Sequence, residues 1–238
     1  MSTLLLVRHA QATPFEAVTD RLSPLGVRQA QALADHWLQT GAELDEVHSG
    51  TLERHRRTAD VVAARIRAAG LRWPPTAAVT AFDEYDGEGI FGVLAGRLAE
   101  RDPQFRDLAA TAEAARGTAE QNRHFQRMAE YVADRWRCGE LTDPAVESWA
   151  DFCTRVDAGI DRVLDGGSGR RVAIFTSGGV IGRTLQRVLR APDDTALALN
   201  WRVKNASLTQ LTFSGRRVSL DTFNVTTHLH RAGLDSYR

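Results

Sequence analysis

An arginine and a histidine stand directly after the first apolar stretch of the chain. The run Leu4-Leu5-Leu6-Val7 has no polar alternation, which predicts a strand buried on both faces, and Arg8 and His9 follow it. In sheets covered by helices, ligands bind beyond the carboxyl ends of the strands. A histidine there can act as a nucleophile or base, and an arginine can hold an anion through its fork of donors. Taken alone, the pair could also end a strand without a chemical role.

A second anion-binding group is predicted at the start of a helix. A short strand over 45–49 precedes a helical run from Thr51, its expected N-cap, to about Ala69, and Arg54 lies in the first turn. The backbone N–H groups of a helix N-terminus and a guanidinium both favour an anion. Without further partners, Arg54 would belong to a solvated basic face of this helix.

An acidic loop follows the next predicted strand. The strand covers 77–82, and the loop over 83–89 carries four carboxylates within six residues. A carboxyl group at a strand end that faces a cationic pocket can act as a general acid. We expect Glu84 in this role, ahead of the other acidic residues Asp83, Asp86 and Glu88, although spacing alone does not separate them from solvated loop charges.

A serine and two glycines follow a late strand signal. Residues 171–176 predict a strand, and Ser177 is expected to cap a helix that extends to about Arg190. Gly178 lets the backbone approach a ligand closely. Ser177 and Gly178 are therefore candidate substrate contacts at the same edge of the sheet.

The helices expected around these strands have apolar residues at three-and-four spacing, which is typical of helices packed on a sheet. One begins at Pro24 after the N-cap Ser23 and ends at Gly41, and another covers 147–165. Residues 93–146 are rich in Ala, Arg, Glu and Gln, and they predict either an inserted helical cap or a helical hairpin with a structural role only.

The chain pattern as a whole predicts an α/β fold. We expect a three-layer sandwich of a mostly parallel sheet flanked by helices, in a single domain over 1–238. Two alternating runs at the end of the chain, 207–213 and 217–223, predict an antiparallel hairpin at the edge of the sheet.

The composition limits the partners and the location of the protein. The 238 residues include 30 basic and 30 acidic side chains, a balance that argues against a general nucleic-acid or membrane surface. Cys138 and Cys153 lack metal-binding spacing and suit a reducing cytosol, and no signal peptide or membrane span is predicted. His228 and His230 have no carboxylate beside them to complete a metal site. We expect a soluble cytoplasmic protein, with a homo-oligomer left open.

Together these segments resemble the histidine phosphatase superfamily, the phosphoglycerate-mutase-like group. Besides Arg8-His9, residues 22–30 are similar to its Leu-Ser/Thr-x-x-Gly-x-x-Gln-Ala segment and residues 52–59 to its Leu-x-Arg-x-x-x-Thr-Ala helix. Glu147-Ser148 resembles the pair before the family's last long helix. The order and spacing of these motifs extend the resemblance over most of the chain.

The resemblance implies a phosphohistidine mechanism without metal or cofactor. His9 would attack phosphorus in line, while Arg8 and Arg54 would hold the equatorial oxygens. Glu84 would protonate the leaving oxygen and then activate the water that releases phosphate. Because His9 must be neutral to attack, activity is expected to fall on acidification.

The chain also departs from the family's pattern. Ala10 replaces the glycine of Arg-His-Gly, and Ala12 and Phe15 stand where the family often has Thr and Asn that touch phosphate. Ser177 stands where the resemblance places a second histidine, before Gly-Gly. By analogy with deleted oxyanion-hole donors, loss of that contact lowers the rate on the order of 10²- to 10³-fold.

Two classes of function follow from these residues. The first is a metal-independent phosphomonoester hydrolase acting on a small phosphorylated metabolite, because His9, Arg8, Arg54 and Glu84 are retained together. The alternative is a weakened or inactive protein that binds phosphate or a phosphoester, because Ser177, Ala12 and Phe15 replace contacts. A phosphoglycerate-type mutase ranks third, since a mutase must shield its phosphohistidine from water.

Overall fold

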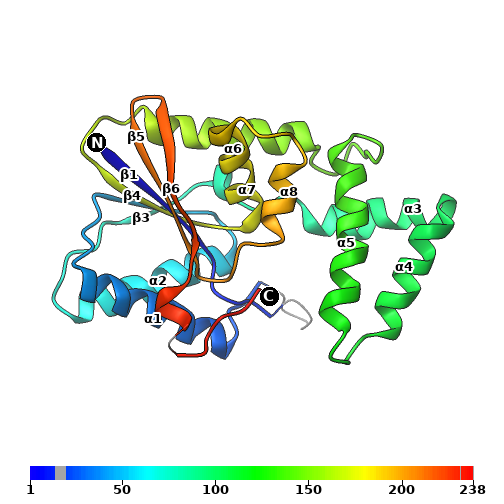
Figure 1. Ribbon diagram of the computed structural model, residues 1–238, viewed down its shortest axis with the longest axis horizontal. Helices are drawn as coiled ribbons and strands as arrows, with labels where there is room; N and C mark the ends of the chain where they lie inside the picture. Colours follow the sequence, from blue (N-terminus) through cyan, green and yellow to red (C-terminus); the bar gives the residue numbers. More distant parts are fainter. Residues whose placement is uncertain (14–19, 231, 238) are drawn as a thin grey trace. The chain divides into compact units, whose positions relative to one another are not determined.

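One sheet forms the centre of the larger part of the protein. The structure is a computed structural model that describes residues 1–13, 20–230 and 232–237. In these ranges the sheet has the strand order β3-β2-β4-β1-β5-β6 (Figure 1). The strands are β1 (Ser2–Arg8), β2 (Glu46–Ser49), β3 (Thr76–Ala78), β4 (Arg171–Thr176), β5 (Leu208–Ser214) and β6 (Arg217–Val225).

The strands β1 and β4 lie side by side in the middle of the sheet and run parallel. Their register pairs Leu4 with Val172 and Arg8 with Thr176. Leu4 and Leu6 are buried on one face of β1, and Leu5 and Val7 are buried on the other, which confirms the prediction of a strand covered on both faces. The strands β2 and β3 run in the same direction, whereas β5 and β6 form an antiparallel hairpin at the edge, as predicted. Four strands therefore bring their carboxyl ends to one edge of the sheet.

Helices cover both faces of this sheet, which confirms the three-layer α/β prediction. The helices α1 (Pro24–Thr40) and α2 (Glu53–Ala68) lie on one face. On the other face lie α6 (Trp149–Leu164), α7 (Gly178–Leu189) and α8 (Thr195–Asn200), and the short α9 (Thr227–His230) follows the hairpin. The core beneath α1 and α2 is formed by apolar side chains that include Leu5, Val7, Leu33, Trp37, Val62 and Phe175.

The ends of α1 agree with the signals read from the sequence. Ser23 Oγ accepts a hydrogen bond from the Gly26 N–H at 3.0 Å, and Pro24 is the first helical residue. Gly41 ends the helix in the left-handed region with φ of 64°, where a glycine has no steric penalty.

Two predicted boundaries are wrong. The strand expected over 77–82 is only Thr76–Ala78, and Thr80–Phe82 forms a 3₁₀ turn, η1, that turns the Phe82 ring into the core, where it is buried. The helix α2 has Leu52 rather than Thr51 as its N-cap. The Thr51 hydroxyl is held instead by Asp83 Oδ2 at 2.6 Å, because this distant carboxylate satisfies the backbone groups at the helix start.

The contacts divide the chain into two compact units. The sheet unit consists of residues 1–84 and 155–238, and the helical unit of residues 85–154. The helical unit contains the π-helical turn η2 (Gly89–Leu94) and the helices α3 (Ala95–Arg101), α4 (Pro103–Ala114) and α5 (Gln121–Arg137). It packs its own aromatic cluster, in which the Trp136 ring lies 5.3 Å from the Tyr85 ring and 5.2 Å from the Trp149 ring. The helices expected over 93–146 fall within this unit, and their role as a cap stays a prediction.

No helix in the described ranges has both the length and the hydropathy that a membrane crossing requires.

Candidate active site

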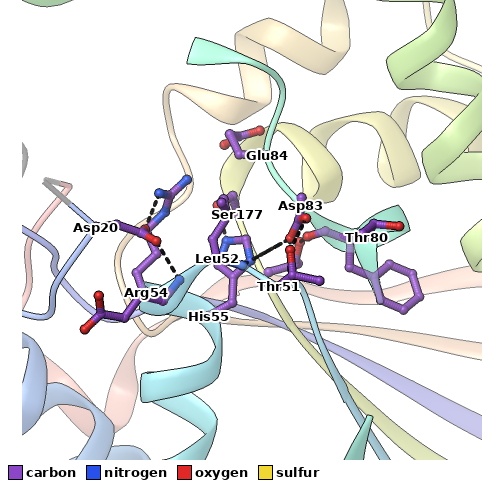
Figure 2. A network of polar contacts seen from close by, with 12 residues as sticks. Asp20, Thr51, Leu52, Arg54, His55, Thr80, Asp83, Glu84 and Ser177 are labelled. Atoms are coloured by element: carbon purple, nitrogen blue, oxygen red, sulfur yellow. Dashed lines mark hydrogen bonds and ion pairs between the residues drawn. The ribbon is translucent and has the colours of Figure 1, made fainter. Parts of the chain in front are cut away.

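Polar side chains from four elements meet at the edge of the sheet where the parallel strands end (Figure 2). His9 follows β1 and Ser177 follows β4, and the His9 N–H donates to Thr176 O at 2.8 Å. Gly50, which follows β2, donates to Phe175 O at 2.9 Å. These backbone hydrogen bonds join the three strand ends, so the side chains that follow them lie close together at this edge of the sheet. All the residues of this candidate active site belong to the sheet unit.

His9 is held as a neutral imidazole with one nitrogen committed. Its Nδ1 lies 2.8 Å from Ala10 O, and because a carbonyl only accepts, the proton belongs on Nδ1. The lone pair is then on Nε2. Burial, followed by the charges of Arg54 and Arg8 and the neighbouring His55, holds the pKa of His9 well below its usual value. His9 is 8% exposed, so the imidazole is largely sheltered from bulk water.

The charges of two guanidiniums, Arg54 and Arg8, act on His9. Arg8 Nη1 donates to Val203 O, which anchors the side chain beside the end of β1. Arg54 Nη1 lies 2.6 Å from Asp20 Oδ1. The other Asp20 oxygen accepts the Glu53 N–H at 2.5 Å, so this carboxylate caps α2 and holds Arg54 with the same group (Figure 2). The Asp20 carboxylate is thus an anionic partner of Arg54 within the protein itself.

The two neighbouring carboxylates of the acidic loop, Asp83 and Glu84, have different hydrogen-bond partners. Asp83 accepts the Thr51 N–H at 2.5 Å and the Thr51 hydroxyl at 2.6 Å. Burial alone would raise the pKa of Asp83, but the nearby His55 and the hydrogen bonds from Thr51 together outweigh it and hold the pKa below its usual value. Glu84 Oε2 instead accepts the Gly179 N–H at 3.2 Å, in the first turn of α7. Asp83 is therefore fixed as a structural anion, whereas Glu84 lies at the helix start nearest Ser177.

Ser177 and Gly178 lie at the junction of β4 and α7, where the sequence places them. Ser177 is the N-cap of α7 with extended backbone, φ −117° and ψ 174°, but its side chain makes no capping bond. Its hydroxyl lies 2.6 Å from His55 Nε2 instead, and both residues are fully buried. A Cβ at Gly178 would lie 2.3 Å from Asn200 Oδ1, so close packing already requires a glycine there.

Sequence reasoning missed three residues of this site: Asp20, His55 and Asp83 in its structural role. His55 lies inside the basic run of residues 54–57, which suggests a solvated helix face. Its spacing was the available signal, because His55, Thr58 and Ala59 follow the three-and-four pattern of the buried face of α2. Asp20 and Asp83 come from distant loops, and no local pattern marks either of them.

Other candidates make separate contacts. Ala10 N donates to Thr58 Oγ1 at 3.0 Å, and the Ala10 side chain is buried. Phe15 lies outside the described residues. His228 Nε2 lies 2.9 Å from Ala206 O, whereas His230 Nδ1 lies 3.3 Å from Asp235 Oδ2. Within the described part of the chain, no group of three or more His, Cys, Asp or Glu side chains is arranged to hold a metal ion.

A surface hollow of about 380 Å³ lies elsewhere on α2. It is lined by Ser49, Glu53, Arg56, Arg57, Asp60, Thr76 and Ala78. These α2 residues follow the three-and-four pattern of a helix face other than the one that carries His55 and Thr58. The lining contains neither His9 nor Arg54, so this hollow is separate from the candidate active site.

The comparisons with known proteins agree with this geometry. The family model described as the histidine phosphatase superfamily (branch 1) matches residues 4–88 and 94–226. No curated protein matches the chain in sequence.

Solved structures share the fold at low sequence identity. A putative α-ribazole-5′-P phosphatase from Escherichia coli has a TM-score of 0.64 and 19% identity, covering 94% of this chain and 98% of its own. A phosphoglycerate mutase from Bacillus anthracis has a TM-score of 0.64 and 19% identity, covering 98% and 96%. A mycobacterial glucosyl-3-phosphoglycerate phosphatase has a TM-score of 0.61 and 22% identity, covering 94% and 99%.

Proposed function

The chain belongs to the histidine phosphatase superfamily, and we propose that it is a phosphomonoesterase that acts through a phosphohistidine at His9. One observation carries this proposal. The hydrogen bond from His9 Nδ1 to Ala10 O leaves the Nε2 lone pair free, with two guanidiniums acting on the same imidazole. A nucleophile with its charged form suppressed, beside two fixed cations, suits attack on a phosphoryl dianion.

The proposed first step forms a nitrogen–phosphorus bond. His9 Nε2 attacks phosphorus, the bond from phosphorus to the ester oxygen breaks, and Glu84 gives its proton to that oxygen as the alcohol leaves. In the second step Glu84 takes a proton from water, whose oxygen attacks phosphorus and releases phosphate from His9. Arg8 and Arg54 stabilise the negative charge on the equatorial oxygens in both steps. The acid is proposed to be Glu84 because Asp83 is already held by Thr51.

The lowered pKa of His9 gives the mechanism its pH range. The neutral imidazole reacts, so the nucleophile is active above its own pKa and is lost as the pH falls through it. Because that pKa lies well below 6.5, the loss of nucleophile is expected in acid rather than near neutrality.

The substrate class is proposed from the chemistry of the site and from named neighbours. The pocket side chains recognise a phosphoryl group, and the similar structures carry names that refer to small phosphorylated compounds. We propose a small phosphorylated metabolite as substrate, with the family's mutase chemistry as the less favoured outcome.

The test uses p-nitrophenyl phosphate with wild type, His9→Ala and the control His230→Ala, in which an exposed imidazole is removed. Wild type and the control should release p-nitrophenol at equal rates in the presence of EDTA. His9→Ala should lose at least about 10⁴-fold in kcat, as other nucleophile deletions do. Quenching the wild-type reaction should trap an acid-labile, base-stable phosphoryl group on His9. Equal rates for wild type and His9→Ala would refute the proposal.

A binding protein without turnover is the second candidate function. The Asp20 carboxylate on Arg54 favours it, because a guanidinium already paired with an anion contributes less to a transition state. In that case orthovanadate would raise the melting temperature of wild type, and no phosphorylated His9 would form.

A further inference from the structure

The buried interior of the site contains a chain of three side chains that the proposed reaction does not use. His55 is fully buried in the first turns of α2, with Nε2 lying 2.6 Å from Ser177 Oγ. On the other side of the ring, Nδ1 lies 3.7 Å from Asp83 Oδ1 (Figure 2). The chain Asp83–His55–Ser177 thus joins the acidic loop, α2 and the start of α7.

The neighbours of His55 favour one tautomer. A proton on Nδ1 faces the Asp83 carboxylate, although 3.7 Å is too long for a hydrogen bond, and Nε2 can then accept the hydroxyl proton of Ser177. Burial, partly opposed by the neighbouring Asp83, lowers the pKa of His55 to about 4. The imidazole is therefore neutral at physiological pH.

The imidazole of His55 has room because residue 50 is a glycine. A Cβ at Gly50 would lie 2.1 Å from His55 Nδ1, 2.6 Å from Asp83 Oδ1 and 2.7 Å from Phe82 O. Any larger residue at Gly50 would have to displace the imidazole or the carboxylate. The absence of a side chain at this position is thus what allows the two groups to meet.

The three side chains Asp83, His55 and Ser177 lie close to the residues proposed to act in the reaction. The His55 ring lies 5.6 Å from the His9 ring, measured between centroids, at an interplanar angle of 39°. Arg54 precedes His55 on α2, and Glu84 binds the Gly179 N–H two residues after Ser177. The hydrogen bond between His55 and Ser177 therefore ties the helix that carries Arg54 to the helix start that holds Glu84.

We propose that His55 is a positioning residue for the reaction at His9: it packs against the nucleophile and, through Ser177, fixes α2 against the start of α7. This inference rests on the proposed phosphatase function. We assign His55 no contact with substrate, because it has no exposed surface. Its contribution is geometric, and a misplacement of about 1 Å in such groups costs about 10²-fold in rate.

Two variants of similar size separate hydrogen bonding from packing. His55→Gln keeps an amide oxygen that can accept from Ser177, whereas His55→Leu fills the space without an acceptor. His55→Leu should lose about 10²-fold in kcat, with KM changed less than about threefold, and His55→Gln should stay within about tenfold of wild type. The control His48→Leu changes a histidine that instead packs on Phe82, 6.0 Å between ring centroids, and it should keep the wild-type kcat.

Ser177→Ala supplies the second arm, also for the case that His55→Leu does not fold. It should lose about tenfold in kcat, and the double variant with His55→Leu should lose no more than His55→Leu alone, because the two residues act through one bond. Equal losses in His55→Gln and His55→Leu, or additive losses in the double variant, would overturn the positioning role.

The remaining outcomes separate this inference from the function on which it rests. A wild type without phosphatase activity defeats the proposed function and the inference together. An active wild type with unchanged His55→Leu and Ser177→Ala defeats the inference alone. If an aryl acetate is hydrolysed and a fluorophosphonate labels Ser177, the chain Asp83–His55–Ser177 activates a serine nucleophile instead, which also overturns the positioning role.

Discussion

The ends of β1 and β4 lie next to each other in the sheet, yet the residues that follow them, His9 and Ser177, make different contacts. The register that pairs Arg8 with Thr176 makes His9 and Ser177 equivalent residues on neighbouring parallel strands. His9 keeps one nitrogen open beside two guanidiniums, whereas the Ser177 hydroxyl is turned inward to His55. The end of β1 therefore carries the proposed nucleophile, whereas the end of β4 carries a side chain that is hydrogen-bonded within the protein. The difference shows that equivalent backbone positions take their roles from the element packed against them, here α2.

The variant with the largest expected effect removes Arg54, one of the two cations that act on His9. Arg54→Ala should lower kcat/KM of aryl phosphate hydrolysis by on the order of 10²- to 10³-fold, because it removes a charged donor from the phosphoryl transition state. Arg54→Lys should recover little, since an ammonium lacks the planar fork. The control Arg57→Ala removes an exposed arginine from another face of α2 and should leave the rate unchanged. If Arg54→Ala and Arg57→Ala have the same rate, Arg54 lies outside the reacting site.

The next test separates the two acidic residues on the β4 side. Glu84→Gln should reduce kcat by about 10²-fold for a poor leaving group such as an alkyl phosphate, and less for p-nitrophenyl phosphate, whose phenolate needs little protonation. Asp83→Asn should lower the melting temperature and shift both substrates equally, because this carboxylate holds Thr51 and faces His55. The control Glu88→Gln changes an exposed acid of the same loop. A leaving-group dependence in Asp83→Asn instead of Glu84→Gln would reverse the assignment.

The acid dependence of protein stability tests the buried state of His55 without a substrate. The pKa of His55 is about 4 in the folded protein and about 6.5 when unfolded, so the unfolded state binds more protons between these values. Stability is fully present above pH 6.5 and falls by about 3 kcal/mol as the pH approaches 4. His55→Gln should flatten this part of the profile in urea unfolding at pH 7, 5.5 and 4.5. His228, whose pKa burial also lowers to about 4, gives a matched variant, His228→Gln, that should flatten the profile without changing kcat. An unchanged slope in His55→Gln would mean that His55 is protonated in the folded protein.

The smallest effect is expected when the two strand ends are made alike. A histidine at position 177 would resemble the family pattern, but Ser177 is fully buried and His55 Nε2 lies 2.6 Å from its hydroxyl. Ser177→His alone should therefore destabilise the protein by about 1–3 kcal/mol through overpacking. The exchange variant Ser177→His/His55→Ser restores the total volume and should recover most of that loss in thermal unfolding. If the single variant is as stable as wild type, the pocket has room for both imidazoles.

Local signals predicted the end of β1, but they did not predict the contact made at the end of β4. The apolar run that ends at Arg8-His9 indicates both the strand and the two polar side chains beyond it within six residues, because strand burial and strand end are local properties. Arg54 was found in the same way, from its place in the first turn of α2. The bond between His55 and Ser177 instead joins residues 122 positions apart, and neither residue type indicates the other.

The wrong boundaries have the same cause. Thr51 has the side chain of an N-cap, but Asp83 arrives from 32 residues away and takes its hydroxyl. Similarly, residues 77–82 have strand-forming side chains, yet burial of Phe82 is achieved by a 3₁₀ turn after Ala78. In each case a tertiary contact overrides the local preference.

The ion pair between Asp20 and Arg54 has a consequence for which anions the site admits. The Asp20 carboxylate satisfies part of the Arg54 fork, so an anionic ligand that binds Arg54 would replace one anionic partner with another. A monoanion such as chloride or acetate gains little from this exchange, because it offers no more charge than Asp20 does. A phosphoryl dianion offers more charge and a bidentate face, and it can displace the carboxylate. We therefore expect the Asp20 carboxylate to keep common cellular monoanions from Arg54 and to be displaced by a phosphate ester.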